Sequence, residues 1–206
     1  MSQQFRGQPL STLLTESEPT VLLIESDSTT PNNPSLPVIL YRQAARLSVS
    51  EPAELFEALF DSNDWPSAWR NGVFDYHHFH TTAHEALGLY SGNVTVLLGG
   101  ENGTEVHIEA GDIAVIPAGV AHKNVGCSDD LGIVGAYPGG QSPDRGRPDA
   151  QRLAENLANI TAVALPSADP AFGTGGALMR HTQTAQGHRA SLVKRRVCHG
   201  SLGIGR

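Results

Sequence analysis

Short apolar runs, each ended by glycine or proline, fill the middle of the chain and limit the folds it can adopt. Between Gly72 and Pro138 the sequence reads VTVLLGG, EVHIEAG, DIAVIPAG and LGIVGAYP in succession. Runs of about four to eight residues fit β-strands, whereas a buried helix needs about ten or more. This rhythm predicts an all-β sandwich or barrel. A length of 206 residues suits one domain with a sizeable core.

Helices are expected only outside this β-rich region. The segment SEPAELFEALFDSNDW, Ser50–Trp65, predicts one helix with Ser50 as its N-cap. Its apolar residues form one stripe at helical spacing: Leu55, Phe56, Leu59 and Phe60. DAQRLAENLANI, at residues 149–160, predicts a second short helix, while VLLIES at 21–26 and LPVILYR at 36–42 predict strands. Trp65 and Trp69 are expected to cover the open end of the barrel.

The charge distribution separates the body of the chain from its C-terminal end. All 21 acidic residues fall at or before Asp169, while six of the 14 lysines and arginines lie from Arg180 onward. We therefore expect an N-terminal arm over residues 1–30, a domain over 31–177, and a basic, disordered tail over 178–206. The chain beyond Phe172 lacks apolar periodicity, so weak order is expected there, and removal of the residues after Gly176 is expected to leave the fold intact.

Composition also excludes several classes of partner and location. An acidic body is a poor binder of polyanions, so no nucleic-acid partner is expected. Two cysteines, Cys127 and Cys198, cannot form a disulfide framework. Neither a secretory signal nor an apolar run of about 18 residues is visible, so no membrane partner is expected. These features predict a soluble, cytoplasmic protein.

A dense histidine cluster, YHHFHTTAHE, begins at Tyr76 and ends at Glu85. If residues 72–81 form a strand, His78 and His80 share one face and can clamp a metal ion. Glu85 can return to the same side after the turn, and His122 follows the turn made by PAG. Three imidazoles and one carboxylate suit Fe(II), Mn(II), Ni(II), Cu(II) or Zn(II). Such a set leaves coordination positions open for substrate or oxygen.

Other residues near the cluster receive secondary roles. Phe74 and Tyr76 share strand parity with the ligands and are expected to line a substrate pocket, and Tyr137 is a further candidate for it. His77 and His84 have the opposite parity or lie in the turn, so a surface position or a contact with the ligands is expected for both. His84 is also the substitute ligand if Glu85 does not bind the metal.

The spacing of these residues resembles the two signature motifs of the cupin superfamily. The first motif, G-x5-H-x-H-x3,4-E-x6-G, is matched by Gly72, His78, His80, Glu85 and Gly92. The second, G-x5-P-x-G-x2-H-x3-N, is matched by Gly111, Pro117, Gly119 and His122, but Gly126 stands where the final Asn belongs. Asn124 shares strand parity with His122 and is expected to face the pocket instead. PNNPSLPVILYR and WRNGVFDYHHFHTTAHEALG resemble the YjlB-like cupins in particular.

This resemblance implies a fold and a range of functions. The fold is a double-stranded β-helix, the cupin jelly roll, in a single domain with one or two peripheral helices and a metal-motif core over residues 72–138. Related fungal cupin oxidoreductases sit beside polyketide synthases, which favours Fe(II) and a dioxygenase-like reaction on a small aromatic or polyketide-derived metabolite in secondary metabolism. A non-redox isomerase or lyase and a non-catalytic binding protein remain alternatives, since cupins host all three. Family habit favours a homodimer.

Overall fold

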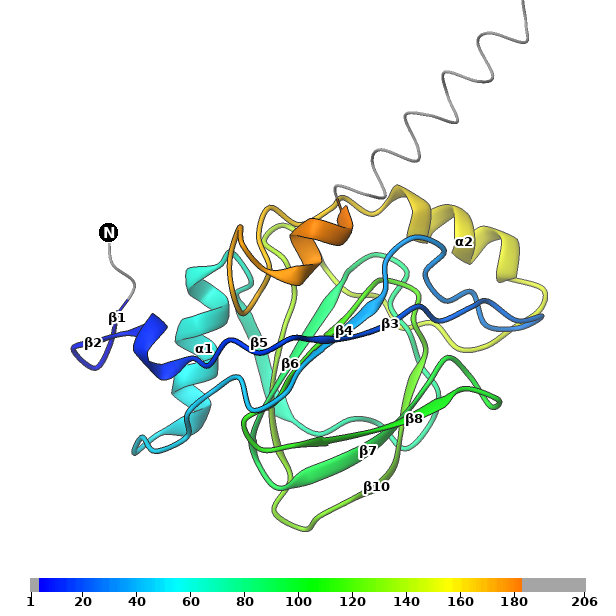
Figure 1. Cartoon of the computed structure of the whole chain (residues 1–206). Coiled ribbons are helices and arrows are strands. Elements are labelled where there is room, and N and C mark those ends of the chain that lie inside the picture. The colour runs from blue at the N-terminus through cyan, green and yellow to red at the C-terminus, as the bar shows by residue number, and fades with distance from the viewer. Residues whose placement is uncertain (1–3, 183–206) are drawn as a thin grey trace, which may run out of the picture.

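Two antiparallel sheets enclose the apolar centre of the protein, which a computed structural model describes over residues 4–182 (Figure 1). The larger sheet has the strand order β3 (Thr20–Leu22), β4 (Val38–Tyr41), β9 (Ile113–Ile116), β6 (Glu85–Ser91), β11 (Gly132–Ala136) and β5 (Ser67–Asn71). The smaller sheet has the order β10 (His122–Cys127), β7 (Asn93–Leu98) and β8 (Thr104–Glu109). A short ribbon of β1 (Gln4–Phe5) and β2 (Gln8–Pro9) precedes the 3-10 helix η1 (Leu10–Leu13). The predicted all-β double-stranded β-helix is confirmed.

Alternation along the strands of the larger sheet divides the core into two parts. Ala114 and Ile116 of β9 pack in the cluster between the two sheets, whereas Ile113 and Val115 pack in a second cluster on the outer face. Successive side chains of a strand point to opposite faces, so a sheet buried on both faces needs apolar residues at every position. This explains why the strand reads IAVI without a polar residue.

The helix α1 (Pro52–Ser62) covers the outer face of the larger sheet (Figure 1). Its predicted apolar stripe is buried: Leu55, Phe56, Leu59 and Phe60 are each at most 1% exposed. Gly88 of β6 lets the helix approach, since a Cβ there would lie 2.4 Å from the Phe56 ring. The predicted N-cap is wrong: Glu51 holds that position, and Ser50 instead accepts a hydrogen bond from Arg6. The second helix, α2 (Leu153–Ala162), begins later than predicted.

Both ends of the described chain belong to the body rather than to flexible arms. Phe5, Leu10 and Leu13 are buried in the outer core cluster, so residues 5–13 form part of the packed structure. Near the other end, Leu178 is 1% exposed and lies in a helical turn at residues 177–182. Its main-chain N–H donates to the buried carboxylate of Asp169, at 3.1 Å. The expectation of weak order beyond Phe172 is therefore wrong as far as residue 182, and the remainder of the proposed tail lies outside the described residues.

No helix within residues 4–182 is both long enough and apolar enough to cross a membrane.

Leu178 should anchor the C-terminal turn. Its replacement by alanine should lower the free energy of unfolding by about 2–5 kcal/mol, because it leaves a cavity in the outer core cluster. A chain that ends at Gly176 should be destabilised similarly, while one that ends at Thr182 keeps the buried turn and serves as the control. Denaturant unfolding checks this, and equal midpoints for the two shortened chains would contradict it.

Candidate metal centre

A pair of main-chain hydrogen bonds brings the two histidine segments together. The N–H of His78 donates to the carbonyl of His122 at 3.2 Å, and the reverse bond measures 2.9 Å. Residues 72–81 do not form the continuous strand that was predicted; they are extended, with isolated bridges at His78 and Phe79. Residues that exchange both hydrogen bonds in an antiparallel pair present their side chains on the same face. The two imidazole rings accordingly lie 4.0 Å apart.

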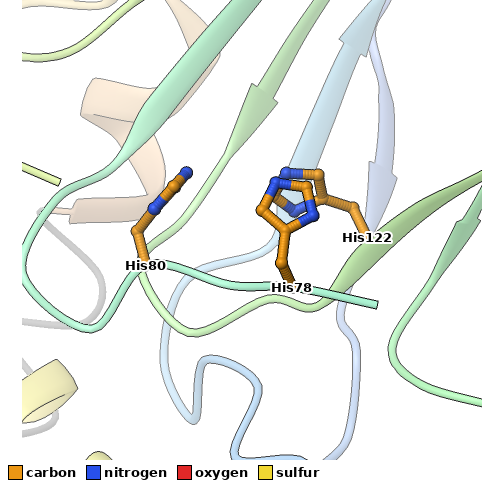
Figure 2. Close-up of side chains that lie close together, drawn as sticks. All are labelled: His78, His80 and His122. Atoms are coloured by element: carbon orange, nitrogen blue, oxygen red, sulfur yellow. The ribbon is translucent and has the colours of Figure 1, made fainter. Parts of the chain in front are cut away.

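His80 completes a group of three imidazoles (Figure 2). Its ring centre is 5.6 Å from that of His78 and 6.0 Å from that of His122. One ring nitrogen of each histidine lies within 4.8 Å of the other two, and all three side chains are buried. This group could hold a metal ion.

Main-chain carbonyls set the orientation of all three rings. The Nδ1 atom of His122 lies 3.1 Å from the carbonyl of Val120, and that of His78 lies 3.4 Å from the carbonyl of Tyr76. Nδ1 of His80 contacts the carbonyl of Asp144. A carbonyl accepts a proton but donates none, so these contacts favour the tautomer with its proton on Nδ1. Each Nε2 then keeps a lone pair for a metal.

Glu85, the first residue of β6, brings a carboxylate to the same place. Its Oε2 atom lies 3.2 Å from Nε2 of His122 and 3.5 Å from Nε2 of His80, and the residue is only 3% exposed. Its Oε1 atom accepts a 2.9 Å hydrogen bond from the hydroxyl of Tyr137, whose oxygen in turn accepts one from Nε1 of Trp69. This chain of hydrogen bonds turns one carboxylate oxygen toward Tyr137 and leaves the other for the imidazoles.

The electrostatics of the group favour a cation at its centre. Burial alone would raise the pKa of Glu85, but the imidazoles of His122 and His80 outweigh it and hold that pKa below its usual range. Burial, reinforced by the neighbouring His122, lowers the pKa of His78 to about 3, so this imidazole is neutral at physiological pH. Burial also acts to lower the pKa of His80, yet the adjacent Glu85 carboxylate raises it above its ordinary value.

Two buried polar atoms of the group are left unsatisfied. Nε2 of His80 and Oε2 of Glu85 have no hydrogen-bond partner among the described residues. Unpaired buried polar atoms are costly and call for an explanation such as a bound ion. A divalent ion that accepts lone pairs from both atoms would explain why they lack hydrogen-bond partners, so the residues present fit a metal.

The four residues line a cavity of about 360 Å³. Its apolar wall contains Trp69, Phe74 and Leu87, and Tyr137 and Arg145 contribute polar groups. A larger cavity of about 990 Å³ lies between the N-terminal segment and residues 167–180, and it contains no histidine. The smaller cavity is therefore the candidate substrate site.

Two of the four predicted pocket residues do not line this cavity. Phe74 and Tyr137 do, but Tyr76 instead stacks on Phe74 with a ring separation of 5.0 Å. Asn124 accepts a hydrogen bond from the N–H of Gly126, at a point where the pairing of β10 shifts register. Strand parity does not apply to Tyr76, because residue 76 lies outside any strand. Asn124 keeps the register of His122, but its side chain binds the Gly126 N–H and does not line the cavity.

His77 and His84 are buried, so the expectation of a surface position is wrong for both. Nδ1 of His84 accepts a 3.0 Å hydrogen bond from the N–H of Ala118, and burial lowers the pKa of His84 to about 4. His84 therefore ties the histidine segment to the turn before His122 instead of joining the imidazole group. His77 lies 3.6 Å from the carboxylate of Glu101, also outside the group.

Sequence reasoning missed the polar residues that the loop before α2 brings to the site. Asp144 and Arg145 lie in SPDRGRP, which has no periodicity that would place it near the histidines. Trp69 was expected at the barrel opening; it lines the cavity, while Trp65 is fully buried in the outer core cluster.

Comparisons with known proteins agree with the family that the motifs predict. The chain is 34% identical over 160 residues to the uncharacterized protein YjlB of Bacillus subtilis (strain 168), a match that covers 77% of this chain and 93% of the relative. No family model matches the chain.

Solved structures give weaker likenesses. A Klebsiella pneumoniae protein with a double-stranded β-helix domain is 18% identical with a TM-score of 0.32, over 70% of this chain and 92% of that one. A variant of oxalate decarboxylase from Bacillus subtilis is 16% identical with a TM-score of 0.32, over 57% of this chain and 29% of that one. The sequence relative carries the assignment: the chain belongs to the YjlB-like cupin family.

Proposed function

We propose that the protein is a mononuclear metal-dependent oxidoreductase that uses dioxygen to act on a small organic molecule. The observation that carries this proposal is the position of three imidazoles and one carboxylate on the wall of a cavity of about 360 Å³. That volume lies near the lower end of the range of about 300–1,000 Å³ typical of ligand pockets. Metal and substrate would therefore share one cavity.

The donor atoms favour a transition metal over Ca²⁺ or Mg²⁺. Imidazole suits Fe, Ni, Cu and Zn, whereas all-oxygen sites suit the harder cations. His78, His80 and His122 would bind through Nε2, and Glu85 through Oε2. Iron in the Fe(II) state is our first choice, because it would supply redox chemistry with dioxygen when bound. Mn(II), Ni(II), Cu(II) and Zn(II) also suit this set.

The remaining residues of the cavity hold the site in shape. Burial and the Glu85 carboxylate raise the pKa of Tyr137, so its phenol stays protonated and keeps donating to Glu85. Trp69 fixes the phenol from its other side. The apolar wall excludes water from the reacting part of the substrate. Resemblance to the fungal cupin oxidoreductases supports an aromatic or polyketide-derived substrate and a role in secondary metabolism.

Metal content should depend on His80 and not on His77. Replacement of His80 by alanine removes one proposed ligand, and the loss of affinity should exceed the roughly 10–100-fold typical of an altered outer contact. Replacement of His77, a buried neighbour outside the group, should leave one ion per chain. Competition with a chromophoric chelator measures both. An empty His77→Ala protein beside a full His80→Ala protein would refute the ligand set.

Oxygen consumption should require a redox-active ion. Metal-free protein, reloaded with either Fe(II) or Zn(II), is mixed with a panel of aromatic and polyketide-derived acids in an oxygen electrode. Only the iron form should consume oxygen together with substrate. Product formed without oxygen would identify an isomerase or lyase instead, and ligand retained without any product would identify a binding protein.

We also propose that the protein is a homodimer that pairs through β3. This strand is an edge of the larger sheet; Val21 within it is 40% exposed, and Leu23 just after it is 63% exposed. Exposed apolar edge strands tend to pair with another chain.

Sedimentation should therefore give about twice the chain mass of 21.8 kDa. Leu23→Lys should reduce the measured mass to that of one chain, because pairing through β3 would bury the charged lysine. Val125→Lys is the matched control, since Val125 is 41% exposed on β10, in the smaller sheet. A single-chain mass for the unaltered protein would exclude this dimer.

A further inference from the structure

Arg145 presents an unpaired positive charge to the candidate substrate cavity. It lines the cavity, and its guanidinium carbon lies 4.7 Å from the centre of the Phe74 ring. Each ion pair within residues 4–182 involves other groups. A guanidinium offers five N–H donors in a fixed fork that matches a carboxylate. The guanidinium of Arg145 lies against an aromatic ring and has no acidic partner within residues 4–182.

The adjacent acid is engaged elsewhere. The carboxylate of Asp144 accepts hydrogen bonds from the N–H of Thr81 at 2.5 Å and from its hydroxyl at 2.7 Å, and a further one from the hydroxyl of Thr82 at 3.2 Å. Asp144 therefore serves to fasten the loop to the histidine segment and does not neutralise its neighbour.

The backbone of Arg145 is fixed from both sides. Asp144 is tied down by the bonds just described, and Gly146 exchanges two main-chain hydrogen bonds with Phe79, at 2.8 and 3.2 Å. A Cβ on Gly146 would lie 2.3 Å from the Phe79 ring, so only glycine permits this approach. The main chain at Arg145 therefore needs little ordering when a ligand binds.

We propose that Arg145 binds the carboxylate of the substrate, so that the site takes organic monocarboxylates whose apolar or aromatic body lies against Phe74 and Trp69. A single fork matches a single carboxylate. A phosphate ester carries a charge of about −1.5 to −2 and would call for further cationic donors, whereas the carboxylates that line the cavity beside Arg145 are the acidic groups of Glu85 and Asp144. The inference deepens the proposed function, since it names the substrate class of the same site.

Arg147 offers a matched control from the same loop. Its guanidinium carbon lies 4.0 Å from the centre of the Tyr76 ring, and Tyr76 stacks on Phe74. Arg147 therefore has the same charge and the same kind of ring contact as Arg145, but it does not line the cavity.

Calorimetric titration with benzoate tests the inference without any turnover. Zn(II)-loaded and metal-free wild-type protein should bind benzoate, and benzamide, its neutral counterpart, should bind far more weakly. Arg145→Gln should weaken benzoate binding by about tenfold or more, the effect of losing a hydrogen bond to a charged group. Arg147→Gln should bind benzoate as the wild type does. Arg145→Lys keeps the charge without the fork and should fall between the two.

Several results would overturn the assignment. One is an equal loss of benzoate affinity in Arg145→Gln and Arg147→Gln, and another is the absence of benzoate binding by the wild type. Benzamide that binds as tightly as benzoate, or phenyl phosphate that binds more tightly, would also overturn it. Unchanged zinc content and thermal midpoint show that each variant is folded. If Arg145→Gln does not fold, Arg145→Lys is compared with the wild type in its place. Because benzoate binding needs no oxygen, failure of the proposed redox function leaves this result standing, and the reverse also holds.

Discussion

The main-chain bridge between His78 and His122 is the constraint on which the candidate site depends. It joins an extended segment to the first residue of β10 and places two imidazoles side by side, with ring centres 4.0 Å apart. Because backbone hydrogen bonds set this geometry, the group of imidazoles that could hold a metal ion is assembled by the fold itself. A site preorganised in this way spends little binding energy on ordering its ligands.

The same segment also positions the wall of the cavity on which we propose that the substrate binds. Phe79, the residue after His78, exchanges main-chain hydrogen bonds with Gly146, and Thr81 binds the Asp144 carboxylate. One short stretch of chain thus carries two of the proposed metal ligands on its side chains, and its main chain holds the loop that bears Arg145. Displacement of this stretch would disturb both the metal and the proposed carboxylate contact, so the two cannot vary independently.

Sequence reasoning succeeded where a short local rule sets the geometry and failed where tertiary contacts do. The spacing of His78 and His80 placed both rings beside His122, and helical periodicity found the buried stripe of α1. Strand parity misplaced Tyr76, because residue 76 lies outside any strand and stacks on Phe74 instead. Leu178 was missed because a single buried turn is too short to show periodicity. Nothing in the local sequence of Arg145 indicates that its loop folds back over the histidines.

Charge couples the two halves of the cavity. The pKa of Tyr137 depends on charges from both sides: burial and Glu85 raise it, and Arg145 lowers it. Without a metal ion, the Glu85 carboxylate opposes the approach of an organic anion and partly cancels the attraction of Arg145. A divalent cation would reverse that local charge, so the anion would meet two positive centres. Linkage is reciprocal, so a bound carboxylate would also retain the metal more tightly. The arrangement therefore favours an order in which the metal is resident and the organic anion comes and goes.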